Sequence, residues 1–139
     1  MFTSANSRSA AAYKRVSIEA SVDLADPHQL VTLLFEALQR SIGIAKLHMQ
    51  AGDIAGKCKQ IGNAMNIIEQ GLKAPLDMEN GGEIASNLRI LYDCCVMRLV
   101  LANARNDTKL LDEVTQLIEP VASGWREIKT SSPKHLRAA

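Results

Sequence analysis

Cysteine thiols are the first candidates for chemistry, because a thiolate can bind a metal or form a disulfide. The chain has three cysteines: Cys94 and Cys95 are adjacent, and Cys58 is remote from both. Two adjacent thiols and one distant thiol make no disulfide framework, and no Cys/His set has the spacing of zinc ligands. We therefore expect reduced thiols in a cytosolic protein and no metal site.

The three histidines could in principle serve a di-iron site or act as general bases. Helical di-iron proteins use Glu-x-x-His pairs, but none of His28, His48 and His135 has a glutamate three residues before it. Gly81-Gly82 is not a phosphate loop either, since no Lys-Ser/Thr pair follows it. Without a pattern of nucleophile, base and orienting group, we expect neither an enzyme nor a cofactor.

Composition limits the partners that the chain can bind. Of its 139 residues, 47% are hydrophobic and only 4% aromatic, and the formal net charge is +1. A nearly neutral chain lacks the basic field that attracts phosphate backbones, so we do not expect it to bind nucleic acid. The N-terminus has no apolar signal segment, and no apolar run approaches the ~20 residues of a membrane span. These features predict one cytosolic domain without membrane insertion.

Helical periodicity predicts the elements that position these side chains. Residues 1–25 carry no sustained period and are expected to form a mobile arm. Asp26 and Pro27 have the residue types of a helix cap and a first helical position. Gly52-Asp53 then separates the first helix from a second one, which is expected to end near Ala74 because Pro75 follows.

The second half of the chain predicts two more helices. A turn cluster at 77–82 precedes a helix expected over 83–104, and Asn106-Asp107 precedes one expected over 107–129, with a kink at Pro120. Short connections favour antiparallel neighbours. We therefore predict an all-α, antiparallel four-helix bundle over 26–130, with a mobile N-terminal arm over 1–25 and a flexible tail over 131–139.

Each helix has an apolar face that is expected to build the core. The four faces are Leu30, Leu34, Leu38, Ile42 and Ala45; Ile54, Cys58, Ile61, Met65, Ile68 and Leu72; Ile84, Leu88, Leu91, Cys95 and Leu99; and Leu110, Val114, Leu117, Val121, Trp125 and Ile128.

The third helix also has apolar residues away from its core face. Ile90, Cys94, Met97 and Leu101 recur at i, i+4, i+7 and i+11 and form what we call the second stripe. Either it packs on a neighbouring helix or on the N-terminal arm, or it is an exposed wall for an incoming amphipathic helix. Ile67 of the second helix also lies off the main apolar face, so the helical wheel predicts that it is not needed for the core.

Several sequence blocks resemble the flagellin-specific secretion chaperones (FliS). They are Ala12-Tyr13-Lys14; Asp26-Pro27-His28-Gln29-Leu30; Ala64, Ile67, Ile68, Gly71, Leu72, Leu76 and Asp77; Gly81-Gly82-Glu83-Ile84-Ala85, Asn87-Leu88 and Leu91-Tyr92-Asp93; and Ala102-Asn103, Asn106-Asp107 and Trp125. The resemblance covers nearly the whole chain in the right order. It departs at Cys94, where a second aromatic residue often stands, and at Pro120.

The resemblance implies a cytosolic export chaperone. Such a protein binds the disordered C-terminal segment of flagellin, which becomes helical on it, prevents premature polymerisation and delivers the subunit to the flagellar type III export gate. A flagellar regulator is a further candidate partner. The N-terminal arm of the family can cover the binding region, a role that would fall to Tyr13 here. The candidate partner-binding residues are Tyr13, Val16, Ile67, Ile90, Cys94, Met97 and Leu101.

Two other functions remain open from the residues alone. One is a helical-bundle enzyme or regulator with a small ligand in its core. The other is a structural oligomer in which the second stripe forms a symmetric interface.

Overall fold

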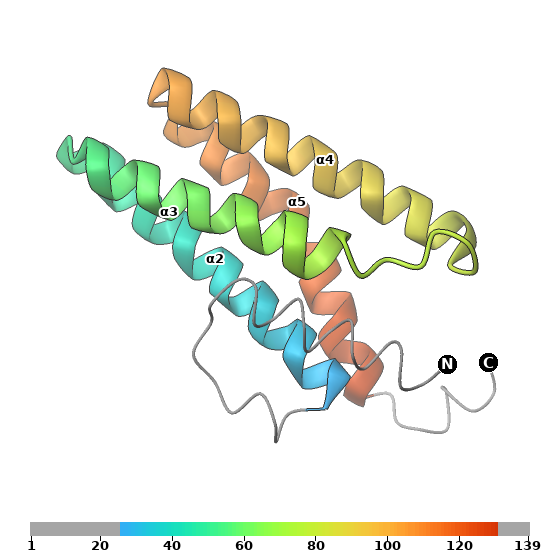
Figure 1. Ribbon diagram of the computed structural model, residues 1–139. Helices are drawn as coiled ribbons and strands as arrows, with labels where there is room; N and C mark the ends of the chain where they lie inside the picture. Colours follow the sequence, from blue (N-terminus) through green and yellow to red (C-terminus); the bar gives the residue numbers. More distant parts are fainter. Residues whose placement is uncertain (1–25, 131–139) are drawn as a thin grey trace.

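The computed structural model describes residues 26–130, which form an antiparallel bundle (Figure 1). Helix α2 spans Pro27–Ala51, and α3 spans Ile54–Asn66 and continues as the π-helix η2 over Ile67–Lys73. Helix α4 spans Gly82–Arg105 and α5 spans Thr108–Thr130. The predicted all-α four-helix bundle is confirmed, whereas the expected arm (1–25) and tail (131–139) lie outside the described residues.

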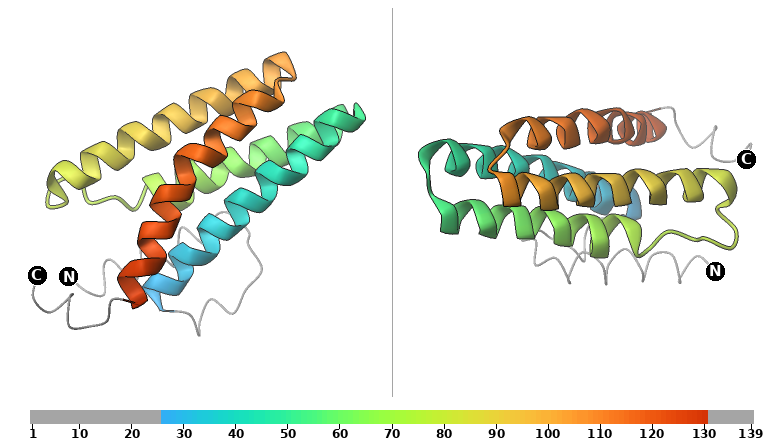
Figure 2. Two further views of the ribbon diagram at one scale, coloured as in Figure 1. Left: turned by 180° about the vertical axis from the view of Figure 1, so that it is seen from behind. Right: turned by 90° about the horizontal axis from the view of Figure 1, so that it is seen from above.

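The helices occupy the four corners of the bundle. Helix α2 packs against α3 and α5, and α4 packs against α5, α3 and η2. Helices α2 and α4 are therefore diagonal to one another, as the view from above shows (Figure 2). This arrangement gives α4 neighbours on one side only and leaves its opposite side facing away from the bundle.

The start and end of α2 follow from local side-chain chemistry. Asp26 Oδ1 accepts a hydrogen bond from the Gln29 N–H at 2.7 Å, and Gln29 Oε1 accepts one from the Asp26 N–H at 3.2 Å. This capping box satisfies backbone donors that have no partner within the helix, and Pro27 fits the first turn without losing a bond. Gly52 ends α2 at φ 77°, where a side chain would be strained, and Asp53 caps α3.

The remaining helix borders lie within one residue of the predicted ones. Asn106 takes the left-handed conformation at φ 51° between α4 and α5, and Asp107 Oδ1 accepts a hydrogen bond from the Lys109 N–H at 2.9 Å. Helix α5 continues through Pro120. The kink expected there stays a prediction.

The core contains side chains from every helix. All five residues predicted for the face of α2 are buried, as are Ile61, Ile68 and Leu72 of the second predicted helix and Cys95 and Leu99 of α4. On α5 the most deeply buried side chains are Leu111, Val114, Ile118 and Ala122. Leu110, Leu117, Val121 and Trp125 pack at the edge of this cluster, so the core face of α5 is rotated from the predicted stripe.

Four residues predicted for the core are instead exposed. They are Ile54, Cys58, Ile84 and Ile128, and the side chain of Ile84 is 73% exposed. Each lies in one of the first two turns or in the last turn of its helix. Helix ends have fewer neighbours than helix centres, so a residue with the right wheel position can still face water.

A buried lysine ties α3 to the turn between α4 and α5. Lys57 is only 5% exposed, and its Nζ donates hydrogen bonds to the Asn103 carbonyl at 3.0 Å and to Asn106 Oδ1 at 2.6 Å. The positive charge lies at the C-terminal end of α4, where unpaired carbonyls make the helix terminus negative. Lys57 therefore satisfies acceptors that the helix leaves open.

Lys57→Met should destabilise the fold by about 1–3 kcal/mol, because it keeps the aliphatic stem but removes both hydrogen bonds to the end of α4. Urea unfolding followed by circular dichroism measures this free energy. The matched control is Lys59→Met, since Lys59 is exposed on the same helix. Equal stabilities of the two variants would show that the Lys57 contacts do not stabilise the bundle.

Candidate protein-binding surface

The second stripe lies on the outward side of α4. Ile90 is 62% exposed and Met97 is 58% exposed, Cys94 is exposed, and Leu101 is half-buried. The buried side of the same helix carries Tyr92, Cys95, Leu99 and Ala102. Helix α4 is thus apolar on two opposite sides, and no described helix covers Ile90, Cys94 or Met97.

Charged side chains border the second stripe on both flanks. On one flank Asp93 forms an ion pair with Lys73 of η2 at 2.6 Å. On the other, Arg98 Nε donates to Glu113 Oε1 of α5 at 3.0 Å. Exposed pairs of this kind contribute little to stability. They do give the apolar stripe the polar rim that is typical of protein interfaces.

Ile67 does not belong to this surface. Its side chain is 0% exposed, as is that of the adjacent Ile68. The expectation that Ile67 is not needed for the core is therefore wrong. The cause is local, because the α-helix changes to the π-helix η2 at Ile67. A π-helix bonds residue i to i+5 and takes more residues per turn, so two consecutive isoleucines can both face the core.

Tyr13 and Val16 lie outside the described residues. Their predicted role in partner binding stays a prediction.

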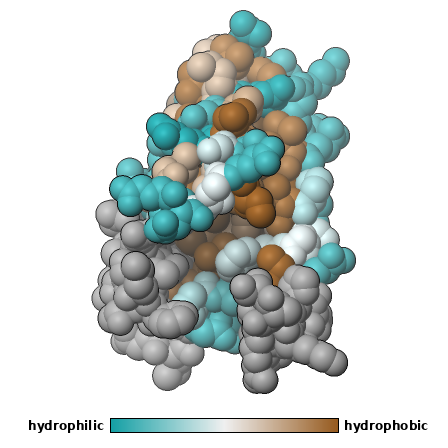
Figure 3. All heavy atoms as spheres, turned by 90° about the vertical axis from the view of Figure 1, so that its right-hand side faces the viewer, coloured by the Kyte–Doolittle hydropathy of each residue, from teal (hydrophilic) through white to brown (hydrophobic). Residues whose placement is uncertain are grey.

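An apolar recess opens at the end of the bundle where α4 begins. It has a volume of about 220 Å³ and is lined by Val31, Phe35, Gly71, Leu72, Pro75, Leu76, Leu88, Tyr92, Val121 and Trp125. Figure 3 looks at this end of the molecule and shows hydrophobic surface within a hollow between more polar side chains. Burial raises the pKa of Tyr92 far above its usual value, so the phenol stays neutral.

His28 and Trp125 form a reciprocal contact beside this recess. Trp125 Nε1 donates to the His28 carbonyl at 3.0 Å, and His28 Nε2 lies 2.7 Å from the Trp125 carbonyl. A carbonyl can only accept, so Nε2 carries the proton. The two rings stack with centroids 4.9 Å apart. The contact joins the start of α2 to the end of α5 and fixes one wall of the recess. The spacing of residues along the sequence does not predict the contact between His28 and Trp125.

The comparison with known proteins matches nearly the whole chain. The family model described as "Flagellar protein FliS" matches residues 9–132. The chain belongs to the FliS family. The flagellar secretion chaperone FliS of Salmonella typhimurium is 45% identical over 123 residues, which cover 88% of this chain and 89% of the relative. Membership in the family supports a role as an export chaperone.

Two further relatives extend the same similarity. The flagellar secretion chaperone FliSB of Pseudomonas aeruginosa is 47% identical over 113 residues, covering 81% of this chain and 89% of the relative. The flagellar secretion chaperone FliS of Bacillus subtilis is 27% identical over 114 residues, covering 82% of this chain and 84% of the relative.

Several residues of the FliS-like sequence blocks have a structural role. Ile67, Ile68 and Leu72 are buried in the core. A side chain at Gly71 would meet Leu34 of α2 at 3.1 Å, so glycine lets η2 and α2 approach closely. These positions build the frame of this FliS-family bundle, whereas the second stripe lies outside that frame.

No group of three His, Cys, Asp or Glu residues within 26–130 could hold a metal ion. None of the helices in this range is long and apolar enough to cross a bilayer.

The three thiols should differ in reactivity. Cys58 and Cys94 are exposed, whereas Cys95 is 0% exposed and burial raises its pKa to about 11. At pH 8 a thiol with that pKa is a thiolate in only about one molecule in a thousand, and the thiolate is the reactive form. Iodoacetamide labelling of the native protein with mass spectrometry should modify Cys58 and Cys94 well before Cys95.

Labelling in urea provides the control, since all three thiols should then react at similar rates. Rapid native alkylation of Cys95 would contradict its place in the core.

Proposed function

We propose that this protein is a cytosolic flagellar export chaperone that binds the C-terminal segment of flagellin as a helix on the second stripe of α4. Binding there prevents premature polymerisation, and the complex delivers the subunit to the type III export gate. The observation that carries the proposal is the exposure of Ile90, Cys94 and Met97 in a chain of this family.

The spacing of the second stripe suits one further helix. Residues 90, 94, 97 and 101 follow the alternating three- and four-residue steps of a coiled-coil seam. From Ile90 to Leu101 the stripe extends over about 16 Å, or three helical turns. A partner helix with apolar residues at the same spacing could pack against it along this length.

The energetics also fit a client that is disordered when free. Such a segment loses conformational entropy when it becomes helical, so binding needs a long apolar contact. Burying each large apolar side chain typically contributes about 1.5–3 kcal/mol. Ile90 and Met97 are exposed in the free bundle, so most of this free energy is gained only when a partner buries them. The recess beside Trp125 can receive a further apolar side chain of the partner.

Replacing both Ile90 and Met97 by Gln should weaken binding of the flagellin C-terminal segment by about 3 kcal/mol, roughly 100-fold in Kd. Both side chains are exposed in the free protein, so its thermal stability should change little. Isothermal titration calorimetry and thermal unfolding measure the two effects.

The matched control for this double variant is Leu47→Gln, because Leu47 is also exposed, at 65%, but belongs to α2. A large loss of stability in the Ile90/Met97 variant would mean that the stripe is part of the core. If light scattering shows that the wild type dimerises through the stripe and does not bind flagellin, the chain is a structural oligomer instead.

We also propose that the N-terminal arm, through Tyr13 and Val16, shields the apolar surface of the free protein. Deleting residues 1–18 should then raise self-association several-fold, because apolar area would become accessible to a second copy. Light scattering over a range of concentrations checks this, with Tyr13→Ser as the milder variant. Unchanged self-association and client affinity in both variants would exclude a shielding role.

A further inference from the structure

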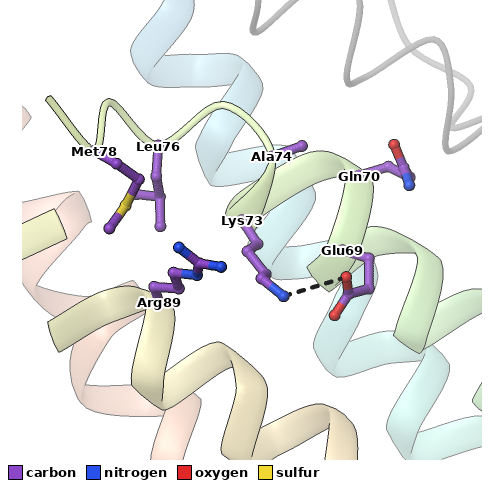
Figure 4. A pocket seen from close by; sticks show the side chains of 7 residues that line it. All are labelled: Glu69, Gln70, Lys73, Ala74, Leu76, Met78 and Arg89. Atoms are coloured by element: carbon purple, nitrogen blue, oxygen red, sulfur yellow. Dashed lines mark ion pairs between the residues drawn. The ribbon is translucent and has the colours of Figure 1, made fainter. Parts of the chain in front are cut away.

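A cleft with both charged and apolar side chains in its walls lies where η2, the loop after it and the start of α4 meet (Figure 4). Its volume is about 330 Å³, and it is lined by Glu69, Gln70, Lys73, Ala74, Leu76, Met78 and Arg89. Two basic side chains, Lys73 and Arg89, face this one cleft. Whether they could bind an acid depends on how far their charges are already compensated.

The charge of Lys73 is compensated by two carboxylates. Its Nζ lies 2.6 Å from Asp93 Oδ1 and 3.5 Å from Glu69 Oε2. The hydrogen bond with Asp93 raises the pKa of Lys73, which keeps the ammonium charged and paired. Lys73 is therefore a poor candidate for binding a further acid.

Arg89 has no such compensation. It forms neither a hydrogen bond nor an ion pair with another residue of the described range 26–130. In Figure 4 its guanidinium points into the cleft, and Lys73 lies between it and Glu69. A guanidinium offers five N–H donors in a planar arrangement that matches a carboxylate. The cleft thus contains an oriented cation with open donors.

The position of Arg89 connects the cleft to the second stripe. Arg89 lies one helical turn before Asp93, on the flank of α4 that borders the second stripe, so its long side chain is within reach of a helix seated on the stripe. Leu76 and the exposed Met78 lie on the same side of the cleft in Figure 4 and offer an apolar wall. An acidic side chain with methylene groups, such as glutamate, could contact this wall while its carboxylate meets Arg89.

We infer that Arg89 forms an ion pair with an acidic side chain of the helix that docks on the second stripe. The inference rests on the proposed function and adds a polar contact to it. The apolar stripe gives affinity but allows the client helix to slide along its axis. One carboxylate held by a bidentate Arg89 fixes the register of that helix, because the pair forms in one position only.

The pair can be tested with the full-length protein and the C-terminal segment of flagellin from the same organism. Arg89→Gln should weaken binding about tenfold, the loss expected for one charge-assisted hydrogen bond, and Arg89→Glu should weaken it further. The affinity of the wild type should fall more with added salt than that of Arg89→Gln, because salt screens the ion pair. Arg40→Gln is the matched control, since Arg40 is exposed on α2.

The acidic partner is identified by replacing each Asp and Glu of the flagellin segment by Lys. One of these variants should bind wild type weakly and regain affinity with Arg89→Glu. A segment with an amidated C-terminus should bind as well as the unmodified one, and loss of binding on amidation would overturn the side-chain pair in favour of the terminal carboxylate.

The outcomes separate this inference from the proposed function. Equal affinities of wild type and Arg89→Gln, or the absence of any charge-swap rescue, would overturn the ion pair alone. A wild-type protein that does not bind the flagellin segment at all would overturn both.

Discussion

A helix in a four-helix bundle can turn only one side toward the core, and α4 is apolar on two. Tyr92, Cys95 and Leu99 occupy its buried side, and Ile90 and Met97 are left on the other. The diagonal placement of α2 and α4 enforces this division, because α4 has neighbours only on its inner side. Exposed apolar area of this kind costs free energy in the isolated chain, and a partner helix that covers it recovers that free energy. The assignment of the chain to a protein-binding role depends on this constraint.

Polar contacts between helices fix the arrangement of the bundle to which a partner can bind. At one end of the bundle His28 and Trp125 join α2 to α5, and at the other Lys57 joins α3 to the end of α4. Both contacts involve groups that are largely removed from water, where a missing partner would be costly. They keep the spacing of the helices fixed while the outward side of α4 stays open. A rigid frame lowers the cost of binding, because the entropy loss then falls mainly on the client.

The buried residues of the family blocks and the second stripe occupy different parts of the molecule. Gly71, Ile67 and Ile68 serve close packing between η2 and the helices around it. The second stripe lies on the side of α4 that faces away from the bundle, and Arg89 is exposed in the cleft between α4 and η2. The first group explains why the chain adopts this fold, and the second group is where we place recognition of the client. A resemblance based on the first group identifies the family without defining the contacts of the site.

Sequence alone determined the helices and their borders, because caps such as Asp26 and Asn106 act within a few residues of the chain. It also determined that α4 has two apolar stripes, since this follows from spacing along one helix. Only the tertiary structure decided which side chains face water. Ile84 and Ile54 are exposed because helix ends have few neighbours, and Ile67 is buried because η2 changes the helical period. The His28–Trp125 contact joins residues 97 positions apart, and the cleft at Arg89 depends on how η2 packs against α4; no local pattern encodes either arrangement.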